Sequence, residues 1–163
     1  MNSGAKELLG KGLAFGSFST GTDIHKVTRA GIEIISSDYS NHIGHYNDQF
    51  PLARLTAGQE IVHLNNGIKL SRVYAGGSLK DGELAELGIT QDDIIKFLIE
   101  IITDHYEAIR LENDFTWTKG NLKYEYKVTG KSEIIPVTSS LETIYFNDVP
   151  VFQHYIIICP IEG

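Results

Sequence analysis

The sequence has little cysteine and no long apolar run. A single cysteine, Cys159, stands among 163 residues, so an intrachain disulfide is excluded and nothing indicates an oxidising compartment. No apolar stretch approaches the roughly 20 residues that a membrane-spanning helix needs. Residues 1–15 also lack the basic and apolar regions of a signal peptide. These absences predict a cytoplasmic protein that does not enter a membrane.

Basic residues are scarce relative to acidic ones. The chain has 14 Lys and Arg against 21 Asp and Glu, which gives a formal net charge of −7. The basic residues do not cluster, and a net negative chain repels the phosphates of a nucleic acid at long range. The sequence therefore predicts no nucleic-acid partner.

The familiar signatures of catalysis are missing as well. The chain contains no Gly-x-Ser-x-Gly nucleophile elbow and no Gly-Lys-Ser/Thr phosphate loop. Glycines stand at positions 10, 12, 16 and 21, but a phosphate cradle needs a strand before it and a helix after it. We expect instead a short helix over residues 5–10 and then an irregular glycine-rich segment. Whether the protein is an enzyme is left open.

The composition that remains is typical of a globular domain. The chain is 42% hydrophobic and 21% charged, and its length suits one domain over residues 1–163. The strongest local pattern begins at Thr90, a suitable N-cap, after which apolar residues recur at helical spacing as far as Ile109. This spacing predicts a helix over about 91–110 whose wide apolar face packs on a sheet.

Strand patterns with turn residues between them occupy the rest of the chain. Predicted strands cover residues 31–35, 39–46, 59–64, 68–74, 115–118, 122–129, 142–146 and 151–159. The Asn-Asn-Gly of residues 65–67 and the Asn-Asp of residues 147–148 favour tight hairpins.

The two hairpins echo each other when residues 56–70 are placed over residues 138–152. Glu60 then falls on Glu142 and Asn65 on Asn147. Any two hairpins share a general pattern, but a generic hairpin gives no reason for the glutamate to recur. We expect an internal repeat over about 32–78 and 115–160, joined by the helix over about 91–110. The predicted fold is α+β, with one or more antiparallel sheets from two similar strand-rich halves and a long central helix packed on the sheet.

Two segments carry a resemblance to a known family. They are Leu-Thr-Ala-Gly-Gln-Glu-Ile-Val at residues 55–62 with Tyr-Ala-Gly-Gly at 74–77, and Gly-Asn-Leu-Lys-Tyr-Glu-Tyr-Lys-Val at 120–128 with Glu142 and the strand 151–155. This pattern resembles a bacterial family known as domain of unknown function 5680, from about Tyr39 to the C-terminus. The resemblance implies a fold and no chemistry, because the family has no established catalytic residues.

Two histidines and a carboxylate lie close together in the sequence. His42, His45 and Asp48 are residue types that a divalent metal prefers as ligands. Their spacing places the two histidines on one face of a helix but on opposite faces of a strand. A metal site is possible here, although polar loop histidines explain the same pattern and no cofactor is predicted outright.

The repeat gives a second group of candidate residues, for ligand binding. Glu60 and Glu142 alternate onto the apolar faces of their strands, where burial would raise a carboxyl pKa and suit acid–base work. Arg72 and His154 hold matching places on the following strands, and an inward arginine could bind a carboxylate or another anion. Each glutamate could equally pair with a nearby Lys, Arg or backbone N–H for purely structural reasons.

These observations favour a non-enzymatic binding or interaction module, with a protein partner, a second copy in a homodimer, or a small molecule as its ligand. The alternative is a small-ligand or metal-dependent enzyme with a cleft between the two halves. A structural accessory of a larger assembly is a third reading. The identity of any ligand or partner cannot be read from the sequence.

Overall fold

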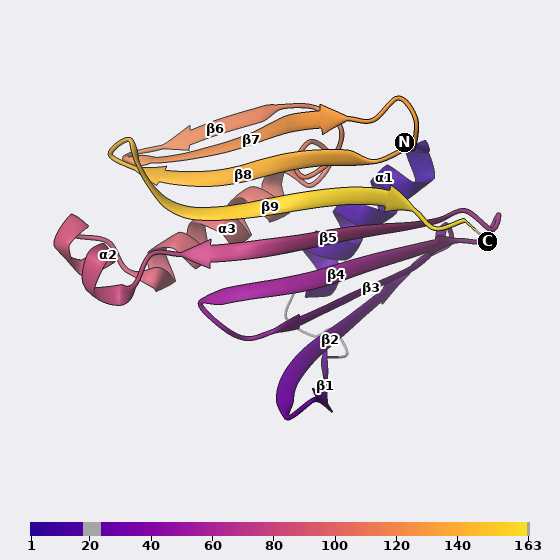
Figure 1. Ribbon diagram of the computed structural model, residues 1–163, viewed down its shortest axis with the longest axis horizontal. Helices are drawn as coiled ribbons and strands as arrows, with labels where there is room; N and C mark the ends of the chain where they lie inside the picture. The colour runs from indigo at the N-terminus through magenta and orange to yellow at the C-terminus, as the bar shows by residue number, and fades with distance from the viewer. Residues whose placement is uncertain (18–23, 163) are drawn as a thin grey trace.

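One antiparallel sheet of nine strands dominates the computed structural model, which describes residues 1–17 and 24–162 (Figure 1). The strands are β1 Ile24–Arg29, β2 Ile32–Ser40, β3 Gly44–Pro51, β4 Leu55–Leu64, β5 Lys69–Ser78, β6 Phe115–Lys119, β7 Leu122–Lys131, β8 Thr138–Phe146 and β9 Val149–Pro160. The helices are α1 Ser3–Lys11, α2 Asp81–Leu87 and α3 Gln91–His105, and a π-helical segment, η1 Gly12–Ser17, follows α1.

The strand order is β1-β2-β3-β4-β5-β9-β8-β7-β6. Strands β1 to β5 form a meander, and so do strands β6 to β9. The two meanders join where β5 pairs with β9, from Leu70 opposite Pro160 to Ser78 opposite Phe152. Helices α2 and α3 connect the end of the first meander to the start of the second (Figure 1).

The predicted fold class was wrong. The structure is mostly β, with a single continuous sheet and three short helices in the described residues, rather than an α+β fold built around a long central helix. The helix expected over 91–110 forms, but it ends at His105. The remaining residues make a turn, and Arg110 adopts a left-handed backbone conformation with φ of 53° that no α-helix accommodates.

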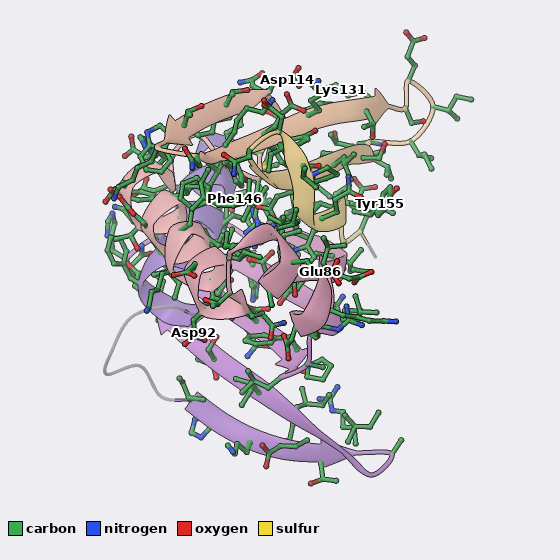
Figure 2. All side chains as sticks on the ribbon, turned by 90° about the vertical axis from the view of Figure 1, so that its left-hand side faces the viewer. Glu86, Asp92, Asp114, Lys131, Phe146 and Tyr155 are labelled. Atoms are coloured by element: carbon green, nitrogen blue, oxygen red, sulfur yellow. The ribbon has the colours of Figure 1, made fainter. Side chains whose placement is uncertain are left out.

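The helices lie on the inner side of a curved sheet. Figure 2, in which Asp92 marks the first turn of α3, shows the strands bending around α2 and α3. A single core cluster joins buried residues of α1 and α3 to those of the sheet, among them Leu9, Ile101, Val62 and Ile156. Because one face of each strand meets this core, inward and outward residues alternate along the chain.

Capping residues explain where α3 begins. The Thr90 side chain accepts a hydrogen bond from the backbone N–H of Asp93, whose carboxylate in turn accepts one from the N–H of Thr90. This capping box satisfies two helix-terminal groups, as the sequence predicted. Across residues 1–17 and 24–162, none of the helices is both long and apolar enough to cross a membrane.

The glycine-rich start of the chain is helical as far as it is described. Helix α1 runs past Gly10 to Lys11 and continues as η1, so the irregular segment predicted after residue 10 was wrong up to Ser17. Gly12 allows this helix to approach β3, because a Cβ there would lie 2.2 Å from the ring of Tyr46. Gly21, the last glycine of the predicted segment, lies outside the described residues.

The side chain of Asn41 explains why one predicted strand does not form. The strand expected over 39–46 was wrong, since the chain turns between β2 and β3 at residues 41–43. The Asn41 side chain accepts hydrogen bonds from the backbone N–H groups of Ile43, at 2.8 Å, and Gly44. Such a local bond offers the backbone an alternative to the sheet ladder.

Candidate functional site

Buried polar side chains cross the inner face of the sheet in two rows. In the first row, Asp48 on β3 lies opposite Glu60 on β4, which lies opposite Arg72 on β5. In the second row, Tyr126 on β7 lies opposite Glu142 on β8, which lies opposite His154 on β9. All of these residues are buried, in a region where ionisable groups are rare unless they are paired.

An arginine–glutamate ion pair lies at the centre of the first row. The guanidinium of Arg72 contacts both oxygens of the Glu60 carboxylate, with Nη2 to Oε1 at 2.5 Å. The hydroxyl of Tyr46 donates to the same Oε1 at 2.7 Å. Both members of the ion pair are fully buried, so removing either would leave an uncompensated charge in the core.

The second row contains the same arrangement with an arginine from another element. Arg110 donates from Nε to Oε1 of Glu142 at 2.7 Å and from Nη2 to Oε2 at 2.6 Å. Tyr124 donates its hydroxyl to Oε1 at 2.7 Å, as Tyr46 does to Glu60. His154 contacts Oε2 through Nδ1 at 3.2 Å.

Arg110 links the two rows. Its backbone carbonyl accepts a hydrogen bond from Nη1 of Arg72 at 2.7 Å, while its side chain binds Glu142. The left-handed backbone at Arg110 directs both groups toward the sheet from the turn after α3. A non-glycine residue in this conformation costs free energy, which the surrounding contacts must offset.

The charges in the two pairs stabilise each other. Burial alone would raise the pKa of Glu142, but the attraction of Arg110 and the hydrogen bonds from His154 and Arg110 outweigh it, so the pKa lies well below its usual range. Burial would lower the pKa of Arg72, yet Glu60 raises it further above its usual value. The expectation of a raised carboxyl pKa is therefore wrong for Glu142, because its arginine partner was not foreseen.

Asp48 behaves differently, because no ion pair forms at its carboxyl group in the described part of the chain. Burial, followed by the nearby negative charge of Glu60, raises the pKa of Asp48 to about 7, against the opposing effect of hydrogen bonds from Ser17 and Tyr74. Oδ2 accepts from the Ser17 hydroxyl at 2.8 Å and Oδ1 from the Tyr74 hydroxyl at 3.2 Å. Asp48 therefore changes charge near neutral pH.

His154 presents a buried nitrogen without a partner. Among the described residues, its Nε2 is the buried side-chain polar atom that makes no hydrogen bond. Nδ1 lies 3.2 Å from Oε2 of Glu142 and 3.4 Å from Nη2 of Arg110, and the nearer carboxylate favours the neutral imidazole with its proton on Nδ1. Nε2 then carries an unused lone pair, an arrangement that costs free energy in a folded protein unless something binds it.

His154 lines a cavity of about 240 Å³ between the sheet and α3. Its polar end also includes Asp48, Tyr74 and Arg110, and its apolar walls include Phe50 and Leu98. Arg110 uses Nε and Nη2 on Glu142, and its Nη1 makes no hydrogen bond within residues 1–17 and 24–162. Apolar walls with a few convergent polar groups are typical of small-molecule sites.

The structure places all four predicted ligand-binding residues in this network. Glu60 pairs with Arg72 and Glu142 contacts His154, with Arg110 between the pairs. Of the four, His154 lines the cavity, whereas Glu60, Arg72 and Glu142 do not. The ion pairs are the structural alternative considered from the sequence, and ligand binding by these residues stays a prediction.

The predicted metal ligands are not brought together. His42 is exposed in the turn before β3, and His45 points outward and bonds Ser40 Oγ through Nδ1 at 2.8 Å. Asp48 is buried on the opposite face of β3, as three-residue spacing on a strand requires. In the described residues, no group of three His, Cys, Asp or Glu side chains could hold a metal ion.

Sequence reasoning missed Arg110, Tyr46 and Tyr124 as members of the site. Arg110 was taken as the last residue of an amphipathic helix, and nothing local marks it as buried. The tyrosines carried a signal that was not used, since each stands one strand before its glutamate, at positions 46 and 60 and at positions 124 and 142.

The internal repeat stays a prediction, and the strand registers of the two hairpins can be compared with it. Val62 lies opposite Leu70 and Ile144 opposite Phe152, so the two hairpins have the same register at these positions. Their turns differ in length, with four residues between β4 and β5 and two between β8 and β9.

Comparison with known proteins places the chain in a family without assigning it a function. No curated protein and no solved structure matched the sequence. A family model described as "Domain of unknown function (DUF5680)" matches residues 48–158, which include both rows of buried polar residues. The match covers more than half of the chain and agrees with the resemblance noted from the sequence. The protein therefore belongs to the DUF5680 family.

Proposed function

We propose that the protein is a binding module for a small molecule with an apolar body, held in the cavity between the sheet and α3. The observation that carries this proposal is an apolar-walled cavity lined by His154, a buried residue whose Nε2 has no hydrogen-bond partner among the described residues. A ligand group that reached this nitrogen would supply the missing hydrogen bond.

The walls of the cavity support the same proposal. Phe50, Leu52, Ile94 and Leu98 line it alongside the polar groups. Burying an apolar chain against such walls contributes about 25 cal/mol per Å² of apolar surface removed from water. The polar groups would then fix the orientation of the ligand.

A panel of probes with one chain and three head groups tests this function. Titration of 1-heptanol, heptanoate and heptylamine into ¹⁵N-labelled protein should show that at least one probe binds saturably, with a dissociation constant of about 0.1–1 mM for a ligand of this size. Its shift changes should centre on backbone amides of cavity residues, including Phe50, Ser78 and Phe152.

Two matched tryptophan variants control this experiment. Ala53→Trp places a large side chain at the exposed mouth of the cavity and should weaken binding. Ala75→Trp adds the same group on the outer face of the sheet and should leave binding unchanged. If none of the three probes saturates, or if Ala75→Trp weakens binding as much as Ala53→Trp, the proposal is wrong.

Binding of a protein partner, self-association as a homodimer and catalysis in a cleft between the halves stay predictions. Exposed apolar residues on the outer face of the sheet, such as Tyr155 (Figure 2), are compatible with a partner surface but do not identify a partner.

A further inference from the structure

The arginine and aspartate side chains that line the cavity differ in what they leave for a ligand. Arg110 is paired with Glu142 through two hydrogen bonds. Asp48 is 2% exposed, and hydroxyl donors already bond both of its oxygens. Burial also raises the pKa of Asp48 to about 7, so its carboxyl group is mostly neutral at pH 6. Arg54 is half-buried, stays positively charged, and makes no ion pair within residues 1–17 and 24–162.

Hydrogen bonds hold the guanidinium of Arg54 against the wall of the cavity, next to Ala53 at its exposed mouth. Nη1 donates to the backbone carbonyl of Ser78 at 2.5 Å, and Gln91 donates from Nε2 to the Ser78 hydroxyl at 2.8 Å. All of these residues line the cavity, and Asp92, labelled in Figure 2, follows Gln91 at this end of α3. In the described part of the chain, Nε and Nη2 of Arg54 make no hydrogen bond.

A carboxylate matches this end of the cavity better than a neutral or a cationic head group. The planar guanidinium can donate two parallel hydrogen bonds to the two carboxylate oxygens. An alcohol would leave the charge of Arg54 unpaired. An ammonium group would be repelled by Arg54 and could find a negative charge in the cavity wall only at buried Asp48, which is mostly neutral at pH 6.

We infer that the ligand of this cavity is a carboxylic acid with a short apolar chain, whose carboxylate pairs with Arg54 at the mouth and whose chain lies against Phe50, Ile94 and Leu98. This inference rests on the proposed function and names its ligand class. The half-buried position of Arg54 lets the charged head keep part of its contact with water, so the cost of burying a charge is largely avoided.

The three heptyl probes separate this inference from the proposed function, because they share one apolar chain. At pH 6, heptanoate should bind about five- to tenfold more tightly than 1-heptanol or heptylamine, the value of a charge-assisted hydrogen bond at a partly exposed site. If heptanoate binds no more tightly than the other two, the carboxylate inference is wrong and the small-ligand function stands. If none of the three saturates, both are wrong.

Two matched arginine variants test the partner of the carboxylate. Arg54→Gln should weaken heptanoate binding about five- to tenfold and leave 1-heptanol binding within about twofold of wild type, which also shows that the variant is folded. Arg29→Gln removes the same charge from the outer face of the sheet, so it changes the net charge equally, and it should leave both affinities unchanged. Arg54→Lys keeps the charge without the planar fork and should recover part of the loss.

A spectroscopic readout in the wild-type protein serves if the Arg54 variants do not fold. The sequence has four arginines, so ¹⁵N-arginine labelling gives four Nε resonances, which through-bond experiments can assign. Heptanoate should move the Nε resonance of Arg54 and leave that of Arg29 in place. If the Arg54 resonance does not move while heptanoate binds, or if Arg54→Gln binds heptanoate as tightly as wild type, the inference is wrong.

Discussion

At the residue scale, the polar groups on the inner face differ in how their charge is compensated. Glu60 and Glu142 each meet an arginine and a tyrosine hydroxyl, whereas Asp48 meets hydroxyl groups alone. The pKa values of Glu142 and Asp48 therefore shift in opposite directions. Pairing lowers the pKa of Glu142, while burial raises the pKa of Asp48 to about 7.

Asp48→Asn should change how stability depends on pH. A carboxyl whose pKa is raised on folding keeps its proton in the folded state, so the contribution of Asp48 to stability falls as pH rises from about 4 to about 7 and is constant above that range. Asparagine stays neutral and can still bond Ser17 and Tyr74. Relative to wild type, the variant should gain stability across this window, on the order of 4 kcal/mol at most.

Urea unfolding of both proteins at pH 4.5 and pH 8 measures this difference. Other titrating groups are present in both proteins, so subtracting the two curves isolates Asp48. Parallel changes in the free energies of unfolding of wild type and variant would show that Asp48 does not titrate in this way.

At the scale of elements, tight turns set the register of the hairpins that carry the site. The turn between β8 and β9 has two residues, Asn147 and Asp148, with φ of 48° and 64°. Two positive φ angles at a two-residue turn suit the right-handed twist of the flanking strands. The sequence predicted this hairpin because asparagine and aspartate tolerate such angles better than most residues.

Asp148→Gly should stabilise the protein by about 0.5 kcal/mol, because glycine adopts positive φ without steric strain but loses more backbone entropy on folding. Asp148→Ala is the matched control and should destabilise, since alanine gains no such freedom at φ of 64°. Urea unfolding at one pH compares the three proteins. A stabilising alanine or a destabilising glycine would contradict this account of the turn.

At the scale of the whole molecule, burial is unevenly distributed across the sheet. Strands β5 and β9 lie at its middle and pair with each other, while β1 lies at an edge with every residue exposed. An edge strand that buries no side chain opens at low free-energy cost, whereas the central strands open only with most of the fold. The polar rows lie on strands β3 to β5 and β7 to β9, away from that edge.

Native-state hydrogen exchange should therefore rank the strands. Amides of β1 should exchange fastest among the paired strands, and amides shared by β5 and β9 should approach the free energy of global unfolding. NMR-detected exchange at several low urea concentrations gives both values. Equal protection of β1 and β9 would mean that β1 is held by contacts that its exposure does not reveal.

The sequence by itself determined the local features of this protein. Alternation of apolar and polar residues predicted most of the strands, a capping box at Thr90 predicted the start of α3, and the asparagine-containing turns predicted two hairpins. The matching positions of Glu60 and Glu142 pointed to buried residues of the site. These features depend on neighbours in the chain, which a periodicity or a turn signal can report.

Tertiary structure alone decided how these pieces join. Pairing of β5 with β9 makes one sheet from two meanders. The local sequence pattern of a strand does not indicate which strand, about 80 residues away, it will pair with. Arg110 is 32 residues from Glu142 and 38 residues from Arg72 along the chain, so its burial and its bonds to these residues follow from packing. The cavity, and the buried nitrogen of His154 that has no partner among the described residues, exist because α3 packs across residues that the sheet brings together from distant parts of the chain.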